Sequence, residues 1–382
     1  MNGYAKSASE WWRQQRHGRW ERVRLRVRSR LRSYDRALQS EQGPVATEDG
    51  PYPSGWYFAR FGEHLRRGQV VPVTFMSQSY ALFRTREGHV GMVDSQCCHL
   101  GADLSRCGSV SGERLVCGYH AWEFDRTGHC TKIPGMDRIP PRARQRSVPV
   151  LERGGNIWFW YGDGPPLPFV DVDFTDDRRR YVTLPGEVSI CHGGLLPLAE
   201  HVTDVSHWPF IHGASEPMQY VSLRNEGRHF EYRVQPSSPV RRMQGFFRPY
   251  ILVTLTGPAS SVVRSQHGPE PNRDRPFLAA VLGSSPVRDG ATITAWRIAV
   301  RKLGPDWLLW PVNRLLAVLL WWVVRRNFHA DLEILRWTRP PAKPLWVKAD
   351  GPSVREFQHF YRRQIVGRPQ NPQPRHDAVE EH

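Results

Sequence analysis

The sequence lacks several features that would assign it to common classes of protein. Six cysteines among 382 residues are too few for a disulfide-rich secreted scaffold. There is no Gly-x-Gly-x-x-Gly motif, so no dinucleotide-binding domain of that type is expected. No hydrophobic region follows the early charges, so we expect no Sec-type leader, a reducing cytoplasmic location and no disulfide. The unbroken apolar run Leu315–Val324 has ten residues, which is too short to span a bilayer.

Two Cys-His pairs stand out in the first half of the chain. Cys97 and His99 come first, and after seventeen intervening residues the pattern repeats with Cys117 and His120. A Rieske [2Fe–2S] cluster is held by two thiolates on one iron and two imidazoles on the other. A zinc finger would instead have its cysteines paired first and its histidines later. The alternating order therefore predicts a Rieske cluster bound by these four residues.

The residues beside these pairs fit a cluster site. Gly101 and Gly118 stand where the backbone is expected to come close to sulfur. Trp122 and Phe124 follow the second pair and are expected to shield the cluster from water, which tunes its potential. Cys98 is interpreted as a neighbour of the cluster and not as a ligand.

A second motif lies about eighty residues further on. Glu200, Asp204 and His207 fall at i, i+4 and i+7, which predicts one face of a helix. His212 follows five residues after His207, and Pro209 is expected to interrupt the helix and bring it back. Two imidazoles and one carboxylate form the facial triad of iron(II) oxygenases. Here the two imidazoles would be His207 and His212, and the carboxylate must come from elsewhere in the chain. The alternative is that His207 and His212 are ordinary interior or interface histidines.

The segments around the Cys-His pairs also resemble a known family. Cys97–Ser105 and Cys117–Asp125 are similar to the Rieske domain of the aromatic-ring-hydroxylating oxygenase superfamily, with Cys98 where that family usually has proline. Respiratory Rieske proteins carry an extra cysteine in each loop, at positions that look like Ala102 and Tyr119 here. The resemblance therefore favours an oxygenase over a respiratory subunit.

Within this superfamily the resemblance is strongest to the ketosteroid 9α-hydroxylase and sterol 7-desaturase oxygenases. It rests on Ile133-Pro134-Gly135, on the segment from Thr203 to His212 and on Ala349–Pro352. It covers residues 53–365 and implies an α+β fold, with an antiparallel β Rieske domain followed by a helix-grip (START-like) catalytic domain.

The resemblance also implies roles for individual residues. The third iron ligand would be Asp331, with Glu333 as the alternative. Asp204 would accept hydrogen bonds from the iron ligand His207 and from the cluster ligand His120 of the partner subunit. Glu200 stands where the family often has an acidic residue, and His201 replaces a common asparagine; neither is assigned a role.

The predicted domains are a basic amphipathic arm and linker (1–52), the Rieske domain (53–166), the iron domain (167–365) and a disordered tail (366–382). The net charge is +16, and no nucleic-acid-reading motif accompanies it. The arm suits an anionic membrane, an acidic partner or a solubilising role. The apolar segment Trp307–Val324 is expected to be a buried helix beside the iron, with an apolar surface that contacts membrane or substrate as the alternative.

These observations predict the terminal oxygenase of a multicomponent Rieske enzyme containing a [2Fe–2S] cluster and mononuclear iron(II). It would take electrons from a ferredoxin or flavin reductase and use dioxygen to hydroxylate a hydrophobic polycyclic or lipid-like substrate. Desaturation, oxidative cyclisation, a non-catalytic electron carrier and a basic membrane-associated scaffold remain alternatives. The family resemblance implies a homotrimer closed head-to-tail.

Overall fold

The computed structural model describes residues 52–365 except for ten short gaps. The gaps are 163, 214–217, 228, 237–249, 267–274, 288–290, 339–340, 342, 348–349 and 351. The chain divides into two compact units, residues 1–44 and 45–382, and all described residues belong to the second. The predicted arm helix and the predicted tail lie outside the described residues.

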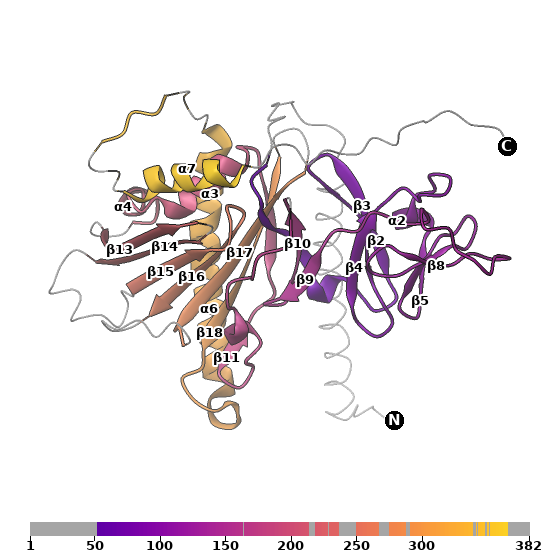
Figure 1. Cartoon of the computed structure of the whole chain (residues 1–382). Coiled ribbons are helices and arrows are strands. Elements are labelled where there is room, and N and C mark those ends of the chain that lie inside the picture. Colours follow the sequence, from indigo (N-terminus) through magenta and orange to yellow (C-terminus); the bar gives the residue numbers. More distant parts are fainter. Residues whose placement is uncertain are drawn as a thin grey trace, which may run out of the picture. The chain divides into compact units, whose positions relative to one another are not determined.

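The first ten strands form three small antiparallel sheets (Figure 1). Their orders are β1-β10-β9, β2-β3-β4 and β5-β6-β7-β8. The strands are β1 (Gly55–Phe61), β2 (Val70–Phe75), β3 (Gln78–Arg84), β4 (Val90–Asp94), β5 (Ser109–Ser111), β6 (Arg114–Val116), β7 (Glu123–Phe124), β8 (Cys130–Lys132), β9 (Val150–Arg153) and β10 (Asn156–Tyr161). The short four-residue helix α2 (Leu104–Cys107) lies between β4 and β5.

Sequence patterning predicts these strands well because aromatic and β-branched residues favour pleated, half-buried surfaces. The expected strands Val70–Phe75 and Asn156–Tyr161 are confirmed with the same bounds. Aromatic pairs hold β1 to β10: Trp56 lies opposite Trp160, and Tyr57 opposite Phe159.

The remaining strands form one eight-stranded antiparallel sheet. Its order is β11-β18-β17-β16-β15-β14-β13, and β12 pairs with β18. The strands are β11 (Tyr181–Thr183), β12 (Glu187–Cys191), β13 (Met218–Glu226), β14 (His229–Pro236), β15 (Tyr250–Leu255), β16 (Ser260–Gln266), β17 (Leu278–Pro286) and β18 (Thr292–Arg301). The predicted strands at Ile251–Leu255 and Thr292–Val300 are confirmed within β15 and β18.

Helices cover one face of this sheet. They are α3 (Leu195–Thr203), α4 (Trp208–Ile211), α6 (Asp306–Trp337) and α7 (Ser353–Gln364). Directly paired residues share a face, and the pairing runs Trp296–Leu282–Ser261–Leu255–Phe230 across five strands. Trp296 packs against α6 and Phe230 against α7, so both helices lie on the same face. Figure 1 shows α3 beside α7 there.

The opposite face of the sheet packs on the first ten strands. Arg297 of β18 donates to Glu63 at 2.7 Å and to Oδ1 of Asn156 at 3.2 Å. Ser285 of β17 donates to the carbonyl of Phe58 in β1 at 2.6 Å. These contacts join the small sheets and the large sheet into one unit.

The prediction that Trp307–Val324 is a buried helix is wrong. The segment belongs to α6, which has 32 residues, continues through Pro311 and has non-helical angles at Leu309. In the most apolar 18-residue stretch of α6, only 11% of the residues are buried. By length and composition, α6 is the one helix among the described residues that could cross a membrane. The run is apolar all round, but only one side meets the sheet.

Candidate metal centres

The two predicted cluster loops have the same backbone turn. The amide of Cys97 donates to the carbonyl of Ala102 at 2.8 Å, and the amide of Cys117 donates to that of Trp122 at 2.9 Å. Each loop follows the end of a short strand, β4 or β6. Equivalent turns present each Cys-His pair in the same way, as two facing ligand loops require.

The rings and thiols of this site lie in different environments. Cys97 and Cys117 are 4% and 2% exposed. The rings of His99 and His120 lie 4.6 Å apart, and Trp122 stacks on His99 at 4.4 Å. The sulfur side is therefore buried, whereas His99 is exposed and His120 half-buried. A cluster held here would present its imidazole edge for electron exchange.

The two glycines beside the ligands also have backbone reasons of their own. A Cβ on Gly118 would lie 2.0 Å from the carbonyl oxygen of Cys107, so the close neighbour is backbone. A Cβ on Gly101 would meet nothing within 4 Å, but its φ of +75° favours glycine. Ala121 adopts a φ of +56° at the equivalent point of the second loop.

Gln145 braces the first loop, and sequence reasoning missed it. Its side chain is 2% exposed and accepts from the amide of Cys98 at 2.9 Å. It also donates to the carbonyls of Asp94 and Gln96, at 2.8 and 2.5 Å. A glutamine 47 residues from its partner carries no local sequence signal.

The second motif does not lie on one helix face as predicted. The helix α3 ends at Thr203, and Asp204 has extended backbone angles. Oδ1 of Asp204 accepts from the amide and hydroxyl of Ser206, at 2.7 and 2.6 Å. This local bonding competes with the helix, so the break precedes Pro209, which instead lies in the first turn of α4 after His207.

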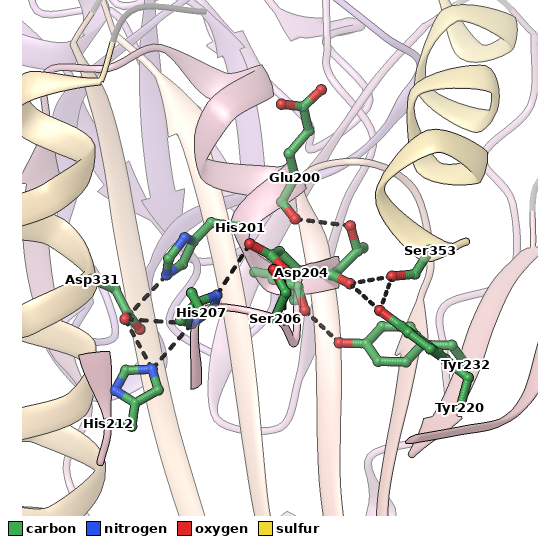
Figure 2. Close-up of polar contacts among 12 residues, drawn as sticks. Glu200, His201, Asp204, Ser206, His207, His212, Tyr220, Tyr232, Asp331 and Ser353 are labelled. Carbon is green, nitrogen blue, oxygen red and sulfur yellow. Dashed lines mark hydrogen bonds and ion pairs between the residues drawn. The ribbon is translucent and has the colours of Figure 1, made fainter. Parts of the chain in front are cut away.

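Hydroxyl groups hold the end of α3 in place. The carbonyl of Thr203 accepts from Ser353 of α7 at 2.5 Å, and the carbonyl of Val202 accepts from Tyr232 of β14 at 2.5 Å (Figure 2). Tyr220 also bonds to Ser353. The last carbonyls of a helix have no partners within it, so these bonds fix the direction in which the chain enters the site.

Three predicted iron ligands lie together (Figure 2). Nε2 of His212 is 3.0 Å from Oδ1 of Asp331 and 3.2 Å from Nε2 of His207. Nε2 of His207 is 3.8 Å from the same oxygen. Two ligands bonded at about 2.1 Å and at right angles lie about 3.0 Å apart. The spacing therefore fits donors that share one metal ion.

The hydrogen bonding also fits a metal ion. The side chains of His207, His212 and Asp331 are 13–17% exposed. Among the described residues, Oδ1 of Asp331 makes no well-aligned hydrogen bond, although ring nitrogens of His201 and His212 lie 3.1 and 3.0 Å away. A buried carboxylate oxygen without a hydrogen bond is costly unless a cation compensates it.

The packing of α6 favours Asp331 over Glu333 as the candidate third iron ligand. Leu332 and Leu335 are buried against Leu198 of α3, which turns Asp331 towards the histidines. Glu333 lies on the exposed side and accepts from Trp337 at 3.2 Å.

His201 joins this group, although no role was predicted for it. It lies on α3, with Nε2 3.1 Å from Oδ1 of Asp331. Its ring stacks on His207 with centroids 4.0 Å apart and planes at 20°. The available signal was a histidine six residues before a predicted ligand, in place of a common asparagine.

Asp204 is ionised and faces His207. Burial raises its pKa, but the facing His207 ring and the hydrogen bonds from Ser206 lower the pKa of Asp204 to about 2. Its Oδ2 lies 3.5 Å from Nδ1 of His207, and 28% of its side chain is exposed. Burial lowers the pKa of His207 despite the carboxylate, which favours the neutral form that a metal ligand needs. Contact between Asp204 and a second subunit stays a prediction.

Glu200 points away from the histidines (Figure 2). It accepts from Gln358 of α7 at 2.6 Å. Burial raises the pKa of Glu200. Its contacts join α3 to α7 and give it no place among the ligands.

The cavities among the described residues include two of very different size. One of about 30 Å³ lies under α3, where Leu198 and Phe328 are among its lining residues. The larger, of about 680 Å³, is lined partly by Glu63 and Arg297 and includes none of the clustered histidines. The smaller cavity is the one beside the candidate iron site, because α3 and α6 also carry His201 and Asp331.

Several known proteins are similar to parts of this chain. The model of the Rieske [2Fe-2S] domain matches residues 55–149. Chlorophyllide a oxygenase of Arabidopsis thaliana is 29% identical over 54% of this chain and 36% of its own length. Cholesterol 7-desaturase of Xenopus laevis is 30% identical over 50% of this chain and 42% of its own length. 4beta-methylsterol monooxygenase of Methylococcus capsulatus is 35% identical over 44% of this chain and 47% of its own length.

The matches span less than half the length of these curated relatives. Among solved structures, dicamba monooxygenase bound to dicamba has a TM-score of 0.62 and 19% identity, over 81% of this chain and 96% of that one. This likeness shows the fold, which confirms the predicted mixed architecture with antiparallel sheets. The chain therefore contains a Rieske [2Fe-2S] domain and is similar, over about half of its length, to enzymes named as oxygenases and desaturases.

Proposed function

We propose that this chain is the terminal oxygenase of a multicomponent Rieske enzyme. The observation that carries the proposal is the convergence of His207, His212 and Asp331 in a chain that also has two Cys-His loops. The proposed domains are 53–166 for the cluster and 167–365 for the iron. The basic arm 1–52 and the tail 366–382 are left without a proposed function.

The proposed ligands form two sets, one for electron transfer and one for dioxygen activation. Cys97, His99, Cys117 and His120 would hold the cluster, which passes electrons singly. His207, His212 and Asp331 would hold iron(II), which supplies dioxygen activation when bound. The described residues contain no nucleotide-binding glycine motif, so we propose that a ferredoxin or flavin reductase supplies the electrons.

Asp204 is proposed to link the two centres. One oxygen is fixed by Ser206, while the other faces Nδ1 of His207. A carboxylate on the second nitrogen of a ligating imidazole fixes its tautomer and orientation. Because the side chain of Asp204 is partly exposed, it is available to accept from His120 of the partner subunit. We therefore propose a homotrimer in which each cluster serves a neighbouring iron.

The proposed substrate is a hydrophobic polycyclic or lipid-like molecule. The names of the relatives include chlorophyllide a, cholesterol and 4beta-methylsterol. The small cavity under α3 has apolar residues and hydroxyls in its lining, including Val202 and Ser261. Its volume of about 30 Å³ is far below the roughly 300 Å³ that ligand pockets need, so side chains must move on binding.

Hydroxylation is the first proposal for the reaction, and desaturation is the second. The cholesterol 7-desaturase relatives favour the second. A screen of sterols and other polycyclic substrates with an added reductase pair, followed by mass spectrometry, separates them. Hydroxylation adds one oxygen atom, whereas desaturation removes two hydrogens. No product with any hydrophobic substrate, from protein with full metal content, would contradict the proposal.

We also propose that α6 lies on a membrane surface while the protein remains cytoplasmic. Leu316, Leu320 and Phe328 pack on the sheet, so α6 cannot leave to span a bilayer without uncovering that core. Its other side exposes large apolar residues: Trp307 85%, Leu308 61%, Trp310 59%, Leu315 61%, Leu319 55%, Trp322 57% and Val323 54%. Exposed Arg314 and Arg326 on the same helix suit anionic headgroups.

Charged substitutions on α6 test this contact. Leu315→Glu with Trp322→Glu should lower binding to phosphatidylserine-containing vesicles at least about 10-fold, because each apolar side chain buried in lipid contributes about 1.5–3 kcal/mol. Flotation with vesicles measures binding. Leu345→Glu is the matched control, since Leu345 is 88% exposed and lies outside α6. Unchanged binding, or a change in oligomeric state instead, would show that lipid is not the partner of this face.

A further inference from the structure

We propose that His201 is a third imidazole ligand of the mononuclear metal. The site would then hold its ion with three imidazoles and one carboxylate, from His201, His207, His212 and Asp331. This inference rests on the proposed function, because it concerns the same ion. It goes beyond the two-histidine set that the sequence predicts, in which His201 has no role.

The geometry places His201 among the other donors (Figure 2). Its Nε2 lies 3.1 Å from Oδ1 of Asp331, and Nε2 of His212 lies 3.0 Å from the same oxygen. His201, His207 and Asp331 each offer one ligand atom within 4.8 Å of the others. His201 is therefore as close to the carboxylate as a residue already predicted to be a ligand.

The ring of His201 is held in place by its neighbours. It stacks on His207 at 4.0 Å, and its side chain is 15% exposed. Its Nε2 is buried and has no aligned hydrogen bond among the described residues. A histidine with a purely structural role usually has a partner for a buried nitrogen. A nitrogen without one, beside a carboxylate oxygen in the same condition, suits a shared cation.

The donor set remains compatible with the proposed reaction. All three imidazoles approach one oxygen of Asp331, Oδ1. Three nitrogens and one oxygen occupy about four of the six positions that an octahedral ion offers, so room remains for small molecules. Neutral imidazoles are good ligands for divalent iron, and an added one should strengthen metal binding relative to the asparagine common in the family.

Cobalt substitution counts the imidazoles directly. The full chain with its cluster in place is loaded with Co(II), and X-ray absorption at the cobalt edge is insensitive to the cluster iron. We expect about three imidazoles in the wild-type protein and about two in His201→Asn, with Co(II) affinity lowered about 10-fold or more. His192→Asn is the matched control, because His192 is exposed just before α3 and should keep the wild-type count.

The wild-type spectrum decides the matter even if a variant folds poorly. About two imidazoles in the wild-type protein would overturn the role of His201 while leaving the proposed function standing. A protein that binds no cobalt would overturn both. An unchanged count and affinity in His201→Asn would also overturn the assignment.

Discussion

His207→Ala should lower product formation by more than about 100-fold while the cluster keeps its visible spectrum. Loss of a residue that only supports a ligand already costs about 10–100-fold in metal affinity or activity, and His207 is a proposed ligand itself. Its Nε2 lies 3.2 Å from Nε2 of His212. Turnover with a reductase pair, measured together with iron content, tests this expectation.

The cluster should survive this change because its surroundings are separate. The buried residues packed around Cys97 and Cys117 lie between Ala81 and Ala143 and include none from α3, α4 or α6. His192→Ala is the matched control, since His192 is exposed and lies just before α3 in the sequence. Retained turnover in His207→Ala would rule out its assignment to iron.

Asp204→Asn should leave both metals bound and lower turnover by about 10–100-fold. Asparagine keeps an oxygen for Ser206 but replaces the acceptor that faces Nδ1 of His207 with an amide group that cannot accept. Electrons should then remain on a reduced cluster. Stopped-flow reduction followed by reoxidation with substrate and dioxygen measures the step.

The control for this variant removes a carboxylate elsewhere in the same half of the chain. The side chain of Asp173 is 76% exposed and forms a surface ion pair with Arg153, at 3.4 Å. Asp173→Asn should therefore behave as wild type. If Asp204→Asn reoxidises its cluster at the wild-type rate, Asp204 does not link the centres. If the Asp204→Asn variant loses iron, the role of Asp204 is to hold His207 in place and not to conduct electrons.

Sequence patterns predicted which side chains lie together better than they predicted the backbone that presents them. The Cys-His pairs and the strands Val70–Phe75 and Asn156–Tyr161 carry strong local signals. The helix expected across Glu200 and His207 was wrong because the Asp204 side chain bonds to Ser206 and ends α3. Spacing alone does not reveal that competition.

Long-range contacts explain what the sequence could not show. Gln145 braces residues about fifty positions away, so no motif marks it. His201 acquires its environment only when α6 brings Asp331 to α3. The apolar run in α6 predicted burial because composition does not tell which sides of a helix meet the sheet. Periodicity shows that a residue is apolar, but tertiary packing decides what covers it.

The most direct test of the account is the metal and sulfide content of protein reconstituted without oxygen. We predict about three irons and about two acid-labile sulfides per chain, with one iron removable by a chelator without loss of the cluster spectrum. About two irons would indicate an electron carrier that lacks the second centre. A colourless protein without acid-labile sulfide would contradict the central claim that this chain conducts electrons from a cluster to an oxygen-activating iron.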